Sequence, residues 1–195
     1  MKEYSSERLL VREIKNADID KRLLSWFDNP ELMKFYTNSR NKITKEVLLD
    51  SIERGKNEGN NFTFLVCNRL TGQSIGTLKL GPINKAHRTS DLVALIGDRS
   101  SINGGGVGTE AIEIGNRIAF TEFDLRKLYG GMYKSNIASI KAYTRAGWIV
   151  EGKLKGQFLV DGVSEDRILV GCFNPNYFTE KEILEARDEN WYQED

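Results

Sequence analysis

The chain has 195 residues, and its 28 Lys and Arg residues balance its 28 Asp and Glu residues, so the formal net charge is zero. This length suits one domain with a substantial core, and the balanced charge argues against a nucleic-acid-binding protein, which usually carries a basic surplus. A polar N-terminus and the lack of eighteen consecutive apolar residues predict neither a secretory signal nor a membrane span, so we expect a cytoplasmic protein without a membrane partner.

The first half of the chain predicts one strand, two helices and then three strands. The first strand covers residues 8–14, and Asn16 or Asp18 is expected to cap a helix that stops before residues 29–30. A second helix begins near Thr44 and ends among residues 55–59. Strands over 62–67 and 74–80 form a hairpin, and the stretch 91–97 reads as the next strand.

The second half alternates helices and strands. A helix runs to about residue 122, followed by a strand over 127–133, a short helix over 136–146, and a closing hairpin of strands 148–156 and 163–172. Cys67 and Cys172 lie in predicted strands, and we expect both to be buried free thiols. The order predicts one mixed α/β domain over residues 1–175 and a charged, helical tail over 176–195, with its helix at 179–191.

The most informative segment is the glycine-rich turn between the strand at 91–97 and the following helix. Strand, glycine turn and helix together aim free backbone N–H groups and the positive end of a helix dipole at a phosphate, and glycine lets a ligand approach without a Cβ in the way. We therefore expect a phosphate-bearing cofactor at Asn103, Gly104, Gly105, Gly106, Val107, Gly108 and Thr109.

This segment does not fit two common phosphate-binding motifs. A nucleotide triphosphatase loop needs Gly-Lys-Ser/Thr, but Gly108 is followed by Thr109 and Glu110. A dinucleotide-binding fingerprint needs a third glycine where this chain has Thr109 or Glu110. On the local sequence alone, the alternative is a tight connection that binds nothing.

Two motifs in this order resemble those of the GNAT acyltransferases, which acetylate amines with acetyl-coenzyme A. The family's cofactor loop reads Arg/Gln-x-x-Gly-x-Gly/Ala, and residues 103–108 fit it except at the first position, where Asn103 is shorter. Residues 134–148 resemble the segment Asn-x-x-Ser/Ala-x-x-x-Tyr-x-x-x-Gly-Phe, with Trp148 in place of the phenylalanine. Within the family, these residues are similar to those of the branch that includes ribosomal-protein N-terminal, polyamine and amino-sugar acetyltransferases.

The resemblance implies a fold and a function. It implies a mixed, mostly antiparallel seven-stranded sheet flanked by about four helices, in a monomer or homodimer. It also implies direct transfer of an acetyl group from acetyl-CoA to a primary amine, without a metal. The amine belongs to a protein N-terminus or a small molecule, and an amino sugar is the main alternative. The first two helices carry a cluster of aromatic residues with few acidic ones, which argues mildly against a polyamine as the acceptor.

The resemblance also assigns the cofactor contacts. The strand before the loop would pair its backbone with the pantetheine arm at Leu95 and Ile96, and a backbone N–H there would polarise the thioester oxygen. The Thr109 hydroxyl is expected to bind a phosphate or to cap its helix. Asn136 is expected to contact the pantetheine arm or to cap the next helix, and Ser139 is expected to contact the cofactor.

Two residues are expected to move protons. Tyr143 occupies the position of the family's thiol-protonating tyrosine, and a phenol of pKa near ~10 can protonate a departing thiolate. The alternative is a tyrosine that only packs against the core. Asp91 is the candidate base for the amine, against the alternative of a solvated carboxylate at a strand end. Asp98 and the single histidine, His87, are weaker candidates, because the first lies in a bend and the second in a loop.

The acceptor is expected to lie against the first helices, at Trp26, Phe27 and Tyr36. A different class of function is a non-catalytic module that binds acyl-CoA, but such a module would have no use for Tyr143 and Asp91.

Overall fold

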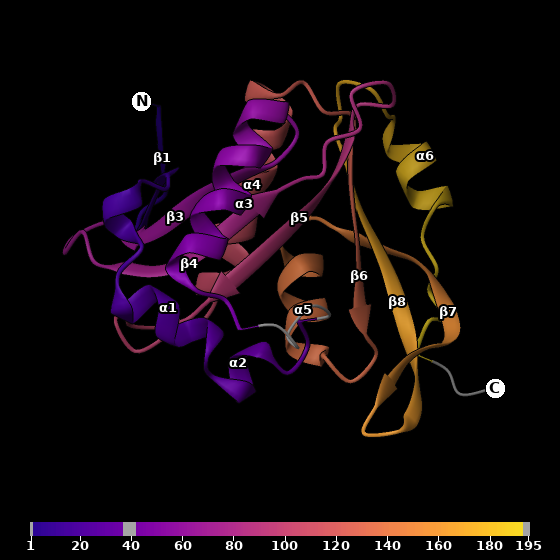
Figure 1. The fold of residues 1–195 in the computed structure, drawn as a ribbon. Coiled ribbons are helices and arrows are strands. Elements are labelled where there is room, and N and C mark those ends of the chain that lie inside the picture. The colour runs from indigo at the N-terminus through magenta and orange to yellow at the C-terminus, as the bar shows by residue number, and fades with distance from the viewer. Residues whose placement is uncertain (1, 37–41, 193–195) are drawn as a thin grey trace.

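The computed structural model describes residues 2–36 and 42–192 and contains one eight-stranded sheet with the strand order β1-β2-β3-β4-β5-β6-β8-β7 (Figure 1). The sequence predicted seven strands, and the difference is β1, which is too short to show a hydrophobic period of its own. The strands are β1 (Glu3–Ser5), β2 (Leu9–Glu13), β3 (Phe62–Asn68), β4 (Ser74–Leu80), β5 (Thr89–Ile96), β6 (Lys127–Tyr133), β7 (Ile149–Val160) and β8 (Val163–Phe173).

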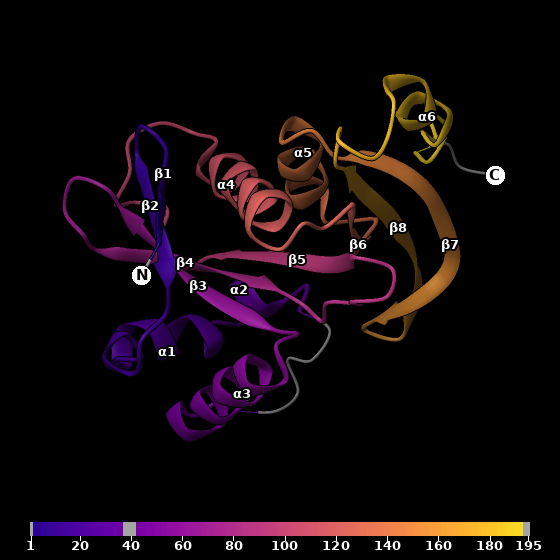
Figure 2. The same ribbon diagram turned by 90° about the horizontal axis from the view of Figure 1, so that it is seen from above.

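Helices cover both faces of the sheet. Helices α4 (Val107–Glu122) and α5 (Ile137–Arg145) pack on one face, and α1 (Lys21–Phe27) and α3 (Lys45–Glu58) pack on the other (Figure 2). The short helix α2 (Pro30–Met33) follows α1, and α6 (Glu180–Glu185) lies beside the β7–β8 end of the sheet. Among residues 2–36 and 42–192, every helix falls short of the length and apolar character needed to cross a bilayer.

Two predicted helix boundaries were wrong. The first helix is capped by Asp20, whose carboxylate accepts a hydrogen bond from the Leu23 N–H at 2.8 Å. Residues 16–18 instead form a 3₁₀ turn, because Asp18 is held outside the helix by a two-pronged ion pair with Arg12 at 2.7 Å. In the tail, α6 ends at Glu185, well before the predicted end at residue 191.

The apolar residues form two cores, one on each face. The larger core lies under α4 and α5 and includes Trp148, which is 2% exposed. The smaller core consists of Leu23, Trp26, Leu65 and Cys67. Both cysteines are buried free thiols, as predicted.

One pair of strands departs from the antiparallel pattern of the described sheet. Strands β5 and β6 are parallel, and they pair only over Thr89–Asp91 of β5 against Lys127–Tyr129 of β6. Beyond Asp91 the two strands diverge, and the β5 edge from Leu92 onward faces α5 without a strand partner among the described residues. This divergence opens the sheet near its centre and positions the candidate site.

Candidate active site

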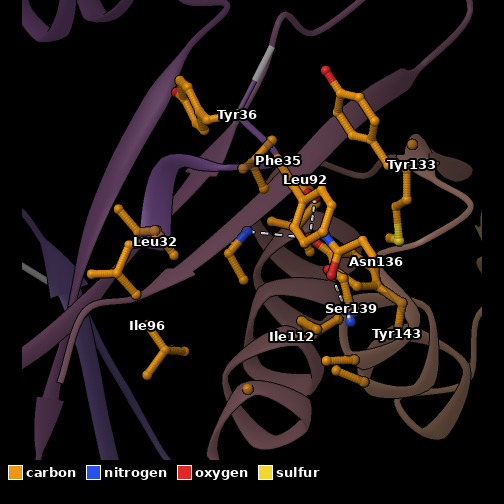
Figure 3. Close-up of a pocket in the computed structure, with 18 of the residues that line it drawn as sticks. Leu32, Phe35, Tyr36, Leu92, Ile96, Ile112, Tyr133, Asn136, Ser139 and Tyr143 are labelled. Carbon is orange, nitrogen blue, oxygen red and sulfur yellow. Dashed lines mark hydrogen bonds between the residues drawn. The ribbon is translucent and has the colours of Figure 1, made fainter. Parts of the chain in front are cut away.

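A cavity of about 330 Å³ lies where β5 and β6 diverge (Figure 3). Its walls come from α2, β5, the start of α4, β6 and α5, so segments from residue 31 to residue 143 contribute to it. Seven predicted site residues and one predicted acceptor residue line it, namely Asp91, Leu95, Ile96, Gly108, Asn136, Ser139 and Tyr143, and then Tyr36.

The free edge of β5 supplies backbone hydrogen-bonding groups to this cavity. In the antiparallel β4–β5 ladder, alternate residues turn their N–H and C=O groups toward β4. Because Gly81 donates to the Asp91 carbonyl and Gly97 donates to the Ile75 carbonyl, the residues facing away from β4 are Leu92, Ala94 and Ile96. The Ile96 N–H therefore points to the open edge, whereas the Leu95 N–H points to β4. Of the two predicted donors for a thioester oxygen, only the Ile96 amide has the required direction.

Tyr143 joins α5 to this edge. Its hydroxyl donates a hydrogen bond to the Leu92 carbonyl oxygen at 2.8 Å and accepts one from the Ala94 N–H at 3.2 Å. The residue is 5% exposed, and its ring meets the Trp148 ring edge-on, with centroids 4.8 Å apart. Burial, and then the nearby charge of Asp91, raise the pKa of Tyr143 above its ordinary value, although the Ala94 N–H opposes this rise. The hydroxyl therefore carries its proton at neutral pH.

Asp91 lies at the point where the two strands separate. Burial raises its pKa to about 6, because a carboxylate with little access to water is unfavourable. The backbone hydrogen bond from Leu92 and the charges of Arg167 and Lys79 act in the opposite direction. A carboxyl with this pKa is largely ionised at pH 7 and is still basic enough to accept a proton, which suits a general base.

The two other candidate bases lie outside this cavity. Asp98 forms an ion pair with Arg22 at 2.5 Å, and its side chain also accepts hydrogen bonds from Ser100 and Ser101. These hydrogen bonds lower the pKa of Asp98 far below the ordinary value, so it is a poor base. His87 is exposed in the connection before β5.

The glycine loop has the backbone geometry expected of an anion site. Gly104 and Gly106 have φ values of 84° and 86°, in the left-handed region that favours glycine. Gly106 is the N-cap of α4 and provides no side-chain hydrogen bond to the first helical turn. The first N–H groups of α4 thus remain available, while a Cβ at Gly105 would meet no heavy atom within 4 Å. Thr109 does not cap the helix, which corrects one of its two predicted roles.

Asn136 caps α5, since its side chain accepts a hydrogen bond from the Ser139 N–H at 3.3 Å. Both side chains line the cavity, so the capping interaction fixes the end of α5 that faces β5 (Figure 3). The predicted capping role of Asn136 is therefore confirmed. Its contact with the pantetheine arm stays a prediction.

The predicted acceptor residues separate in the structure. Trp26 is 5% exposed and belongs to the smaller core, where a Cβ added at Gly97 would overlap its ring. It lines neither of the two described cavities, so its role is packing. Phe27 instead lines a second cavity of about 140 Å³ between α3 and the sheet, and Tyr36 lines both cavities. Lys79 is the charged residue in that second lining, which is otherwise mostly apolar.

Three residues of the site escaped the sequence prediction. Arg167 of β8 lies over Gly131, and its Nε is buried without a hydrogen-bond partner among the described residues. Glu31 of α2 lines the first cavity. Arg8 contacts the glycine loop from the turn before β2. No local motif marks these residues, because the fold brings them in from distant segments.

The aromatic side chains of Phe35, Tyr133 and Phe158 form a continuous group beside the cavity. The Phe35 and Tyr133 centroids are 5.6 Å apart, and Tyr133 stacks on Phe158 at 4.0 Å. Across the part of the chain that the structure describes, no three His, Cys, Asp or Glu side chains gather into a group that could bind a metal ion.

A family model and individual relatives both match this chain. Residues 8–149 match the acetyltransferase (GNAT) domain family. A spermidine N(1)-acetyltransferase of Escherichia coli is 30% identical over 109 residues, which are 56% of this chain and 58% of that protein. A probable N-acetyltransferase of Bacillus subtilis is 28% identical over 102 residues, or 52% and 56% of the two chains. The chain thus matches less than two thirds of the length of these relatives.

Two solved structures share the fold across almost their whole length. A spermidine N-acetyltransferase from Vibrio cholerae, in complex with CoA and spermine, has a TM-score of 0.77 at 20% identity and covers 88% of this chain and 99% of its own. A ribosomal-protein-S5-alanine acetyltransferase from Vibrio fischeri has a TM-score of 0.76 at 20% identity, with coverages of 91% and 100%.

Proposed function

The chain belongs to the GNAT acetyltransferase family, and we propose that it is an N-acetyltransferase that transfers an acetyl group from acetyl-CoA directly to a primary amine. The observation that carries the proposal is the divergence of β5 and β6. It brings a basic carboxyl, a protonated phenol, a free strand edge and an uncapped helix N-terminus to one cavity. These groups match the needs of the reaction one by one.

The residues present fit acetyl-CoA. Its phosphates would be held by the N–H groups of residues 104–108, with the Thr109 hydroxyl beside them, because this end of α4 has no capping side chain. The pantetheine arm would run along the free edge of β5, past Leu95 and Ile96, and between that edge and the start of α5 at Asn136 and Ser139. When bound, acetyl-CoA supplies an electrophilic thioester carbonyl, and the Ile96 N–H is the donor that faces this path.

Asp91 would accept the proton of the attacking amine, directly or through water. Its pKa of about 6 lies below that of a free α-amino group, near ~8, so the ionised carboxyl prevails at neutral pH while a fraction of the amine is already neutral. The partial burial of Asp91 strengthens its interaction with the developing ammonium, because the local dielectric is low.

Tyr143 would return a proton to the thiolate of CoA. The hydroxyl is protonated, points at the β5 edge and has the Ala94 N–H as a fixed donor. Once the proton has left Tyr Oη, that N–H would stabilise the phenolate, which compensates in part for the raised pKa of the buried phenol.

The acceptor would enter from the α2 side, where Glu31, Phe35, Tyr36 and Tyr133 line the cavity. Glu31 and Asp91 favour a cation such as a protonated amine, and the similarity to spermidine acetyltransferases makes a small-molecule amine the first candidate. Protein N-termini and amino sugars are the other acceptors in this proposal.

The experiment is a thiol-release assay with acetyl-CoA and a panel of spermidine, short peptides, amino sugars and simple monoamines. We expect acetyl-CoA-dependent thiol release with at least one acceptor, and a CoA-induced rise in melting temperature. CoA binding without turnover on any acceptor would favour the non-catalytic acyl-CoA-binding alternative. The absence of both CoA binding and turnover would refute the proposal.

A further inference from the structure

The glycine loop is supported from outside by a residue more than ninety positions earlier in the chain. Arg8 lies in the turn between β1 and β2, and its Nη1 donates hydrogen bonds to the carbonyl oxygens of Asn103 and Gly105, each at 3.2 Å. An added Cβ at Gly104 would lie 3.5 Å from the same Nη1, so the guanidinium rests directly against the loop.

These two contacts determine where the loop's donors point. A trans peptide is planar, so its C=O and N–H groups point in opposite directions. The carbonyls of Asn103 and Gly105 are turned toward Arg8, and the N–H groups of Gly104 and Gly106 are therefore turned away from it. Since both glycines adopt left-handed backbone angles, the loop has little intrinsic preference to keep this arrangement without an external contact.

The guanidinium itself is held in place by α4. Its Nε donates to Glu110 Oε2 at 2.7 Å, and its Nη2 pairs with the same oxygen at 2.5 Å. Glu110 also accepts hydrogen bonds from the Ser6 hydroxyl at 2.5 Å and the Arg8 backbone N–H at 3.2 Å. Burial opposes the charge of Glu110, but these hydrogen bonds from Ser6 and Arg8 outweigh it and lower the pKa of the carboxyl. The carboxylate thus fixes the turn and the arginine to the first turn of α4.

We infer that Arg8 is the positioning residue of the phosphate-binding loop, orienting the Gly104 and Gly106 amides toward the cofactor in place of a side chain from the loop itself. The first loop position holds the short Asn103, and it is the Asn103 backbone carbonyl that contacts Arg8. Arginine is suited to this task because its planar fork can serve the carbonyls and the carboxylate together, whereas the lysine ammonium has no such fixed geometry. The inference rests on the proposed use of CoA.

The test compares three single variants with the wild-type protein. Arg8→Ala removes all the side-chain contacts, and Arg8→Lys retains a charge near Glu110 without the fork. Arg69→Ala is the matched control, because Arg69 Nη1 donates to the Ser6 carbonyl at 2.6 Å and so anchors the same turn without touching the loop. Calorimetry gives the Kd of CoA, and steady-state kinetics give kcat and the KM of each substrate.

For Arg8→Ala we expect the Kd of CoA and the KM of acetyl-CoA to rise about tenfold, or roughly 1.4 kcal/mol, the size of one or two lost hydrogen bonds. The KM of the acceptor and kcat at saturation should change less than about twofold, since Asp91 and Tyr143 are untouched. Arg8→Lys should recover only part of the affinity, and Arg69→Ala should bind CoA like the wild type.

A double variant distinguishes loop positioning from general damage. Adding Asn103→Arg to Arg8→Ala places a long cation at the loop's first position, and we expect it to restore part of the CoA affinity. Wild-type CoA affinity in Arg8→Ala, or an equal loss in Arg69→Ala, would overturn the inference while the proposed function stands. Failure of the wild-type protein itself to bind CoA would instead refute the proposed function.

Discussion

The Tyr143 hydroxyl bridges the Leu92 carbonyl oxygen and the Ala94 N–H, at 2.8 and 3.2 Å. A residue of α5 thereby takes the two hydrogen bonds that a neighbouring strand would make with β5. The same hydroxyl lies at the cavity through which we propose that the acyl group passes. One hydroxyl therefore both holds α5 against the edge of β5 and takes part in the proposed chemistry.

We predict that Tyr143→Phe slows turnover by roughly ten- to a thousandfold while CoA affinity is kept, because the change removes one proton donor and preserves the ring. The loss of its hydroxyl leaves two backbone groups without their partner, so we also expect a stability loss of about 1–3 kcal/mol. Kinetics well below the melting temperature separate the two effects. An unchanged kcat across the pH profile would exclude the catalytic role.

Asp91→Asn should remove one limb of the pH–activity profile. With kinetics expressed per neutral amine, wild-type kcat/KM should rise with pH through about 6 as the carboxyl ionises. The variant should be at least tenfold slower and flat in this range. A variant that retained the limb near pH 6 would show that another group titrates there.

The ionised form of Asp91 should also lower the free energy of unfolding at pH values above the pKa of its carboxyl. Its folded-state pKa of about 6 exceeds the ordinary value of 3.8, so the folded state binds the proton more tightly than the unfolded chain. The stability that this preference provides is complete below about pH 4 and is lost as pH rises toward and beyond 6, by roughly 3 kcal/mol at most. Asp91→Asn should therefore be more stable than the wild type at pH 7. Urea unfolding of both proteins at pH 4 and at pH 7 measures this difference. A variant less stable at pH 7 would contradict this account.

Gly108→Val should weaken CoA binding at least tenfold with little effect on folding. A Cβ at Gly108 would meet Ala142 Cβ at 3.9 Å and Ile96 Cγ1 at 4.0 Å, which are ordinary contacts, but the valine methyl groups would enter the cavity. Gly152→Val in β7 is the control, because a Cβ there meets nothing within 4 Å and the position is outside the cavity. CoA titration calorimetry compares the variants, and equal affinity in Gly108→Val would mean that the loop is only a connection.

Neighbouring residues in α1 should give opposite phenotypes. Trp26→Ala should destabilise the protein by about 3–5 kcal/mol, since its ring fills the smaller core. Phe27→Ala should be milder for stability and should raise the acceptor KM, because Phe27 lines the cavity that Tyr36 shares with the site. Thermal unfolding and acceptor kinetics together test the pair, and a Trp26→Ala protein of normal stability would show that the ring is not a core element.

The sequence alone was enough to predict the order of the main elements, the position of the glycine loop and the motif that carries Asn136 and Tyr143. These features are local: a hydrophobic period, a turn that needs glycine and a cap three residues from its partner all leave a mark within one turn or one strand. It also located Asp91, Leu95 and Ile96 in the strand that lines the cavity, and Trp148 in the core.

Which of these groups lie together, and in which environment, depends on the three-dimensional packing of the chain. The pairing of β5 with β4 decides whether the Leu95 or the Ile96 amide is left free. This pairing joins two strands that are separate in the sequence, so it is a long-range property. Trp26 and Phe27 are adjacent in sequence, yet one fills a core and the other a cavity, because their side chains leave α1 in different directions. The hydrogen bonds of Arg8 to the glycine loop join segments far apart in the chain, and the burial that raises the pKa of Asp91 also comes from distant segments, so no local pattern records either feature.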